Sequence, residues 1–266
     1  MLSTDEIDTT PVPDKREYHE VADSTYWLPK DEEEQSRLTG DMASAYPNST
    51  FIGVDIVQVV NPSLMSDKVK FQYGNILHGL EFEDSTFDLV NMRFFVFALK
   101  SEEWPVAIKE VLRVTKPRGI IQMMEPEFKI PENAIVRSAF TAVMEASMAR
   151  GQDPYIINKL EKHIEETGAK IIEREEKTVN LSSPTALAKK CTWSRIQGIK
   201  SVLPVVGPKL GLHSKEDEQR FLDETLKAIQ TSNVYSSIRG NAYKRSYRRK
   251  VFDCLHTAMV AKSMVE

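Results

Sequence analysis

Residues 50–58 read Thr-Phe-Ile-Gly-Val-Asp-Ile-Val-Gln, and this stretch decides the fold. Its short apolar run is typical of a strand that is buried on both faces of a sheet. Asp55 interrupts the run near its carboxyl end, where a carboxylate is costly unless it lies at an exposed tip or has a partner. Ligands of open α/β sheets bind beyond the carboxyl ends of parallel strands, and an acidic side chain there can bind both hydroxyls of a ribose. A helix-capping or solvated loop aspartate is the alternative interpretation.

The composition narrows the class of protein. The chain has 266 residues, of which 41% are apolar, enough for one large α/β domain or one domain with an elaboration. The net charge of -4 argues against nucleic acid as a main partner. No apolar run approaches the ~20 residues of a membrane span, and the polar, acidic start has no secretory signal. We therefore expect no membrane partner and a cytoplasmic protein, with a nuclear location as the alternative.

The cysteines and histidines give no sign of a metal site. The two cysteines lie in unrelated contexts and are expected to be reduced, buried thiols. The five histidines are isolated, and no pair of histidines or cysteines has the spacing of metal ligands. We assign no metal.

Strand and helix patterns alternate in the first half of the chain. Strands are expected at 51–56, 69–73, 87–92 and 120–124, and a helix at 102–112. This alternation at short spacing predicts a parallel sheet with right-handed crossovers. The second half is more helical. Helices are expected at 135–150 and 155–167 and after residues 183 and 214, a charged extended segment at 170–179, and a final strand within 251–261.

Four motifs in order carry a family resemblance. They are Phe-Ile-Gly-Val-Asp-Ile at 51–56, Tyr-Gly-Asn-Ile at 73–76, Phe-Asp-Leu-Val-Asn-Met-Arg at 87–93 and Glu-Val-Leu-Arg-Val-Thr-Lys-Pro-Arg-Gly at 110–119. Together they resemble a class I S-adenosylmethionine-dependent methyltransferase over most of residues 18–262. The segment Tyr-Trp-Leu-Pro at 26–29, with the acidic helix after it, looks like the opening segment common in fungal members.

The resemblance implies an α/β fold with a Rossmann-like, mostly parallel sheet flanked by helices and a helical lid in the C-terminal half. It divides the chain into four parts. These are a disordered tail at 1–17, an N-terminal arm and helix at 18–40, a truncated cofactor-binding half at 41–130, and a C-terminal half with the lid and final strands at 131–266.

The resemblance also implies a cofactor, S-adenosylmethionine, and residues that hold its adenosine. Asp55 would hold the ribose hydroxyls, and Ile56 would pack on the adenine. Asn75 and Ile76 would meet the polar edge and the face of the adenine.

A second group of residues would surround the methionine part of the cofactor. Asn91, Met92 and Arg93 would line the floor below it and below the methyl group. Tyr26 and Trp27 would belong to the arm that closes over the cofactor.

The expected acceptor is a small molecule. Phe94 and Phe95 could form a wall of its pocket, and core packing accounts for both equally well. Glu125 follows the 120–124 strand at the ligand edge, so we expect a pocket residue that is also a weak candidate for the base that deprotonates the acceptor. A capping role, or pairing with a neighbouring arginine, is the alternative for Glu125.

One departure from the family pattern bears on activity. The family begins its sheet with a strand that ends in a glycine-rich loop, because backbone without a Cβ can approach the methionine moiety. The chain instead reads Ser-Arg-Leu-Thr-Gly-Asp at 36–41, with one glycine and no apolar strand before it. We therefore expect the first, central strand to be missing, as after a skipped exon or a faulty gene model.

The missing strand would lie between the Asp55 strand and the Asn91 strand. Without it these two strands must pair directly, recruit another segment, or leave a defective sheet, because unpaired buried backbone groups cost about 1–3 kcal/mol each. The same loss predicts weak or no cofactor binding.

Three functions therefore compete. The first is a methyltransferase of a small-molecule acceptor, and the second is a catalytically inactive relative that acts, if at all, as a binding module. The third, a nucleotide-sugar or NAD enzyme that uses Asp55 for ribose, also needs a glycine loop and lacks the support of the later motifs.

Overall fold

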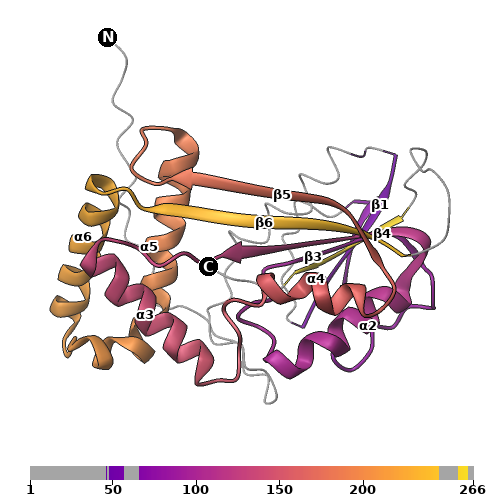
Figure 1. Cartoon of the computed structure of the whole chain (residues 1–266), viewed down its shortest axis with the longest axis horizontal. Coiled ribbons are helices and arrows are strands. Elements are labelled where there is room, and N and C mark those ends of the chain that lie inside the picture. The colour runs from indigo at the N-terminus through magenta and orange to yellow at the C-terminus, as the bar shows by residue number, and fades with distance from the viewer. Residues whose placement is uncertain (1–45, 47, 57–65, 246–256, 263–266) are drawn as a thin grey trace, which may run out of the picture.

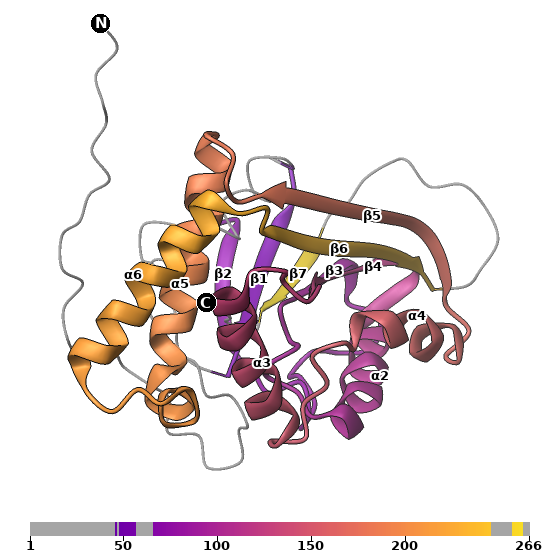
Figure 2. The ribbon, with the colours of Figure 1, turned by 60° about the vertical axis from the view of Figure 1, so that its left-hand side comes forward.

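The computed structural model describes residues 46, 48–56, 66–245 and 257–262, and only the backbone of 257–262. Seven strands form one sheet (Figure 1), and their order is β2-β1-β7-β3-β4-β6-β5, as Figure 2 shows. They are β1 (Thr50–Asp55), β2 (Val69–Tyr73), β3 (Phe87–Arg93), β4 (Thr115–Glu127), β5 (Lys170–Asn180), β6 (Tyr235–Lys244) and β7 (Thr257–Lys262). The first five strands in the sheet are parallel, and β6 runs antiparallel to both β4 and β5. The predicted Rossmann-like, mostly parallel sheet flanked by helices is confirmed.

The helices form two groups (Figure 2). Helix α2 (Trp104–Val114), preceded by the 3-10 turn η2 (Ser101–Glu103), lies with α4 (Ile157–Glu165) against one face of the sheet. The second group gathers where β5 ends and β6 begins, and contains α3 (Ala134–Met148), α5 (Ala186–Val206), η3 (Gly207–Leu210) and α6 (Lys215–Thr231). This group follows the carboxyl ends of β4 and β5, where the lid is predicted. Whether it covers a ligand stays a prediction.

Side-chain caps fix the starts of the second group. The Asn133 side chain accepts hydrogen bonds from the amides of Ile135 and Val136 before α3. Thr185 and Ser214 cap α5 and α6 in the same way. Each cap satisfies amides that have no partner inside the helix.

The main core lies between α2 and the middle strands. The apolar face of α2 presents Trp104, Ile108 and Val111, which are almost completely buried against a cluster that includes Met92 and Met123. These two methionines are register partners on β3 and β4. The core therefore fixes β3 and β4, whose carboxyl ends carry several of the predicted site residues.

The 110–119 motif has a structural role. Arg113 donates hydrogen bonds to the carbonyls of Leu80 and Phe82 and to the carboxylates of Asp84 and Glu110. Glu110 in turn accepts a hydrogen bond from the Leu80 amide at 2.6 Å. This network ties α2 to the segment that leads into β3, which sets where β3 begins.

Residues 116–119 are looped out of the β3–β4 ladder. The pairing moves from Phe87–Thr115 to Leu89–Ile120, so four residues of β4 have no partner on β3. Arg118 has a φ of 72°, and a Cβ on Gly119 would come within 2.7 Å of the Thr115 side chain. These four residues form a bulge in β4.

The middle of the sheet holds β7. It pairs in parallel with β1 on one side and with β3 on the other. The final strand was expected within 251–261 and lies at Thr257–Lys262. The Asp55 strand and the Asn91 strand were expected to pair directly, to recruit another segment, or to leave a defective sheet. In the structure they recruit another segment, because β7 lies between them.

Candidate functional site

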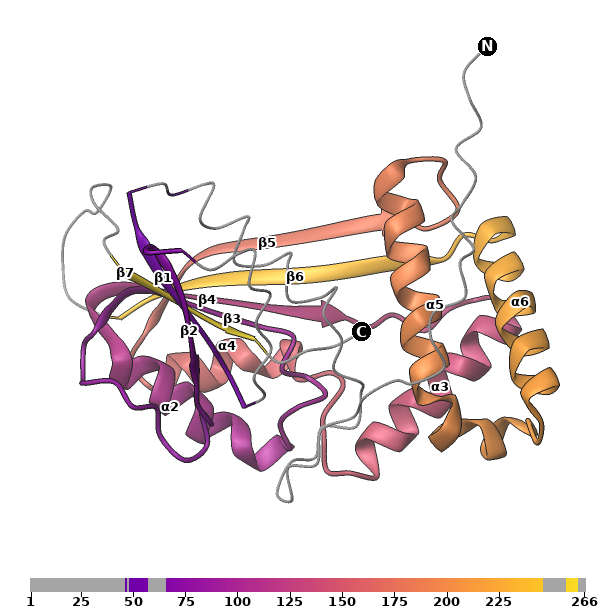
Figure 3. The same ribbon diagram turned by 180° about the vertical axis from the view of Figure 1, so that it is seen from behind.

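Most of the predicted site residues come together at one edge of the sheet. Asp55 and Arg93 are the last residues of β1 and β3, and Glu127 is the last residue of β4. Val54 and Met92 are both aligned with Ala261 of β7, so Asp55 and Arg93 lie at the same level, two strands apart. Figure 3 shows β2, β1 and β7 from behind, and β1 lies between the other two. This edge, formed by the carboxyl ends of parallel strands, is where α/β sheets bind ligands.

The end of β1 is joined to the turn after β2. The carbonyl of Asp55 accepts a hydrogen bond from the Gly74 amide at 2.9 Å. A Cβ on Gly74 would lie 2.9 Å from the Val54 side chain and 3.0 Å from the Leu80 side chain, so any other residue here would require one of them to shift. Asp55 is 9% exposed, and Asn75 directly follows the glycine that is bonded to its carbonyl. Ile56 follows β1 directly and is half-buried.

Asn75 begins the next turn, and two of its oxygen atoms accept hydrogen bonds within that turn. Its side-chain oxygen accepts a hydrogen bond from the Leu77 amide at 2.9 Å, and its carbonyl accepts one from His78 at 3.0 Å. The NH₂ group of the Asn75 side chain makes none of the hydrogen bonds of this turn, so it can donate to a ligand. The next residue, Ile76, is buried in the main core. Its contact with an adenine face stays a prediction.

The three residues predicted for the floor differ in their surroundings. Met92 is completely buried in the core next to α2. Asn91 and Arg93 alternate with it along β3 and so lie on the other face of the sheet. Asn91 is 2% exposed, and its side-chain oxygen has no hydrogen-bond partner in the described part of the chain. A buried acceptor of this kind needs a partner, which a ligand or water can supply.

Glu125 holds the backbone that follows β3. Its carboxylate accepts hydrogen bonds from the amides of Phe95 at 2.8 Å and Val96 at 3.1 Å. Phe94, just before them, has a φ of 58°. Glu125 is 1% exposed, and burial raises its pKa to about 8 although the two amide hydrogen bonds lower it. The capping alternative therefore describes its contacts, and its role as a base stays a prediction.

An ion-pair network that the sequence did not reveal surrounds Glu127. Arg239 of β6 donates a hydrogen bond to Glu127, and Lys129 lies 3.4 Å from the same carboxylate. Lys129 also pairs with Glu176 of β5 at 2.9 Å. Four charged residues from three strands and a loop therefore meet beside Glu125. Each was visible only as an isolated charge, because the antiparallel pairing of β4 with β6 brings them together.

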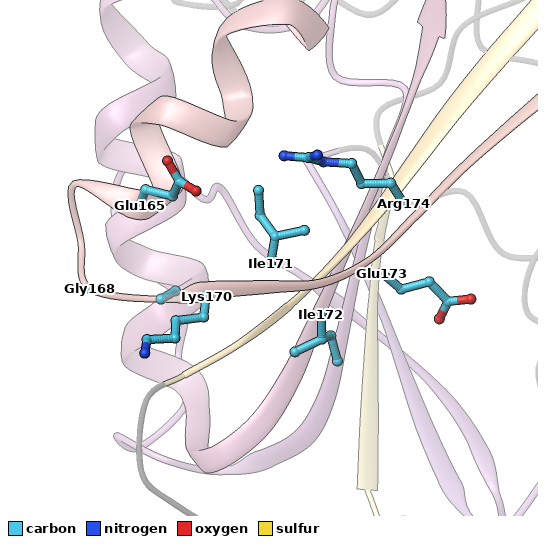
Figure 4. Close-up of a pocket in the computed structure, with 8 residues that line it drawn as sticks. Glu165, Gly168, Lys170, Ile171, Ile172, Glu173 and Arg174 are labelled. Atoms are coloured by element: carbon cyan, nitrogen blue, oxygen red, sulfur yellow. The ribbon is translucent and has the colours of Figure 1, made fainter.

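A surface pocket of about 800 Å³ lies at the other end of the sheet (Figure 4). It is lined by Glu165 and residues 168–174, at the start of β5. Figure 4 shows Ile171 and Ile172 pointing to different sides of the strand. None of the predicted site residues lines this pocket. Two of them, Tyr26 and Trp27, lie outside the described residues.

The described residues contain no group of three or more His, Cys, Asp and Glu side chains that could hold a metal ion. Within the same residues, no helix has the length and apolarity needed to cross a membrane.

Comparisons with known proteins connect one segment of the chain to a family. Residues 35–123 match the family model described as a methyltransferase domain, Methyltransf_11. The match includes β1, β2, β3 and α2 and ends within β4, so Glu125 and β7 lie outside it. No curated protein matches the chain.

Solved structures with a similar arrangement include several methyltransferases. A putative methyltransferase from Bacillus halodurans is 16% identical, with a TM-score of 0.46 and coverage of 79% of this chain and 89% of that one. A SAM-dependent methyltransferase from Methanosarcina mazei is 14% identical, with a TM-score of 0.47 and coverage of 80% and 88%. Haemonchus contortus phosphoethanolamine N-methyltransferase 2, bound to phosphomonomethylethanolamine and S-adenosylhomocysteine, is 12% identical, with a TM-score of 0.45 and coverage of 78% and 52%. At these values the likenesses assign no function.

The edge of the sheet offers groups for the nucleoside half of S-adenosylmethionine. These are the carboxylate of Asp55, the close approach of the backbone at Gly74 and the NH₂ group of Asn75. The described residues at this edge therefore fit a nucleoside.

Proposed function

We propose that this chain is an S-adenosylmethionine-dependent methyltransferase of a small-molecule acceptor. The observation that carries the proposal is the placement of Asp55 at the carboxyl end of β1, beside the Gly74–Asn75 turn and level with Arg93. The match of residues 35–123 to a methyltransferase domain supports it.

Each residue has a defined task in this proposal. The Asp55 carboxylate accepts hydrogen bonds from both ribose hydroxyls, and the Asn75 side chain donates to the adenine. Asn91 offers its unsatisfied oxygen from the floor. S-adenosylmethionine supplies a methyl group already activated by its sulfonium, so the protein has mainly to align the acceptor. Glu125 contributes by fixing residues 94–96. It would act as a base only if the acceptor displaced those contacts.

Titration calorimetry with S-adenosylmethionine tests the proposal. Asp55→Asn removes one charged acceptor, and hydrogen bonds to charged groups contribute ~1.5–3 kcal/mol, so affinity should fall about 10- to 100-fold. Asp88→Asn is the matched control, because Asp88 lies near the start of β3 and pairs with Lys116. The affinity of the Asp88→Asn variant for S-adenosylmethionine should equal that of the unmodified chain. Equal affinities of all three proteins would contradict the placement of ribose at Asp55.

A second candidate, a methyltransferase-like binding protein without catalysis, is favoured by the middle of the sheet. There β7 occupies the position of the strand that ends in a glycine-rich loop in the family that the sequence resembles. The same titration separates the two candidates. Absence of heat with S-adenosylmethionine, in a chain whose thermal unfolding is cooperative, would support the binding protein and reject the enzyme.

A further inference from the structure

The centre of the sheet is completed by a segment from far along the sequence. β1 and β3 do not pair with each other, and β7 lies between them. Five residues of β7, Thr257 to Ala261, are aligned with five of β1, and five, Ala258 to Lys262, with five of β3. Both edges of β7 are therefore engaged, and β1 and β2 hydrogen bond to the other described strands of the sheet through β7 alone.

The space between β1 and β3 has the properties of a strand-binding site. Without an occupant, both strands would present unpaired amide and carbonyl groups in the interior of the sheet, where water cannot replace the lost partners. Segments that add to a sheet are held by main-chain hydrogen bonds, and side-chain character selects among them. Residues 257–262 read Thr-Ala-Met-Val-Ala-Lys, an apolar run suited to an inner strand.

The connection within one chain is long enough. Lys244 of β6 is aligned with Ile120 of β4, Ile120 with Leu89 of β3, and Leu89 with Ala258 of β7, so all four lie at one level of the sheet. The crossing from β6 to β7 covers three strand spacings, about 15 Å. The twelve residues 245–256 can span up to ~40 Å when extended. One chain can therefore supply its own central strand.

We propose that the space between β1 and β3 is a peptide-binding site for an extended, apolar, parallel segment, and that its resident ligand is residues 257–262 of the same chain. The site is defined by backbone pairing and does not depend on the proposed methyltransferase function. It holds the Asp55 strand in register with the Asn91 strand, and so assembles the candidate ligand edge.

Paired cysteines in the full chain test the register and the source of the strand. Thr50 and Thr257 are aligned, with Cα atoms one strand spacing of ~4.8 Å apart, which is within disulfide range. With Cys191 and Cys254 replaced by serine, Thr50→Cys with Thr257→Cys should form a disulfide within the monomer under mild oxidation. The control is Thr50→Cys with Ala261→Cys. Position 261 lies four residues further along β7, about 13 Å away, so this pair should remain reduced.

Two results of this experiment would overturn the proposal. Equal yields from both pairs, or no disulfide from either, would show that residues 257–262 do not hold this register. A disulfide found only in covalent dimers would show that the strand comes from a second copy of the chain. Neither readout depends on cofactor binding, so the proposed function can fail while this proposal stands.

A proline in β7 tests the site as a peptide-binding site. Val260→Pro in the full chain removes an amide from an inner strand and should lower the melting temperature by about 6–12 °C. Val260→Ala keeps the amide and should lower it by less. A synthetic peptide of residues 257–266 should restore stability to the proline variant and leave the unmodified chain unchanged. An unchanged melting temperature in the proline variant, or a folded variant that the peptide does not stabilise, would overturn the proposal. If the variant does not fold, the cysteine pairs decide.

Discussion

Glu125 makes stability depend on pH in a direction opposite to that of most carboxylates. Burial raises its pKa from 4.5 to about 8 in the folded chain. Between these two values the folded state keeps the proton that the unfolded state has released. The free energy of unfolding should therefore fall as pH rises from about 4.5 to 8, by up to ~1.4 kcal/mol per pH unit from this one group. The contribution is fully present below pH 4.5 and is lost above the folded pKa.

Glu125→Gln separates the proton from the hydrogen bonds. The amide of glutamine can accept from Phe95 or Val96, but its NH₂ group faces the other amide, so the variant should be destabilised by ~1–3 kcal/mol at pH 5. The contribution of residue 125 to the pH dependence of the free energy of unfolding should disappear. Urea unfolding at pH 5, 6, 7 and 8 measures both effects. A slope identical to that of the unmodified chain would mean that Glu125 does not hold a proton in this range.

The bulge in β4 holds a residue in an unfavourable backbone conformation. Arg118 is exposed and has a φ of 72°, a region that suits glycine. Arg118→Gly should therefore stabilise the chain by roughly 0.5–1 kcal/mol, raising the melting temperature by about 1–4 °C. Arg118→Ala removes the same side chain but keeps the Cβ, so it is the matched control and should give no comparable gain. Equal melting temperatures for the two variants would locate the strain elsewhere.

The helices and strands of this chain were easier to predict from the sequence than the strands that lie next to each other in the sheet. The apolar run of β1, the alternation of β2 and the Ser214 cap of α6 are local signals, and each predicted element is present. The final strand was also expected, because residues 251–261 alternate well enough for one. Its position in the sheet was not predicted, since alternation indicates a strand but not which strands lie beside it. Pairing of β7 with β1 depends on residues about 200 positions apart in the sequence.

The residues of the candidate site also differ in how well the sequence predicts them. Asp55 could be placed at the ligand edge because a carboxylate at the end of a buried strand has few acceptable positions. The contacts of Glu125 with the amides of Phe95 and Val96 could not be predicted, because they depend on how the backbone turns after β3. The Arg239–Glu127 pair could not be predicted either, because it joins two strands over 100 residues apart. Local chemistry identifies candidates, and tertiary pairing determines which groups they meet.

In the whole molecule, β7 is the hydrogen-bonded link between two parts of the sheet. On one side are β2 and β1, and on the other β3, β4, β6 and β5. The second part also contacts α2 and α4, whereas β1 adds to the main core chiefly through Val54. Separation of β7 from its neighbours should therefore release β1 and β2 while β4 and β6 remain paired. Regions that open in this way exchange their amide hydrogens at lower free energy than the global unfolding reaction.

Native-state hydrogen exchange of the unmodified chain should show two classes of protection. Amides of β1 and β2 should exchange at least about tenfold faster than the paired amides of β4 and β6, a difference of ~1.4 kcal/mol in opening free energy. Low concentrations of urea should accelerate the first class before the second, because partial opening exposes less surface than global unfolding. Peptides from the two classes can be compared within one mass-spectrometric experiment, so each serves as the control for the other. Uniform protection across all four strands would mean that the sheet opens as one unit and that β7 holds β1 as firmly as β4 holds β6.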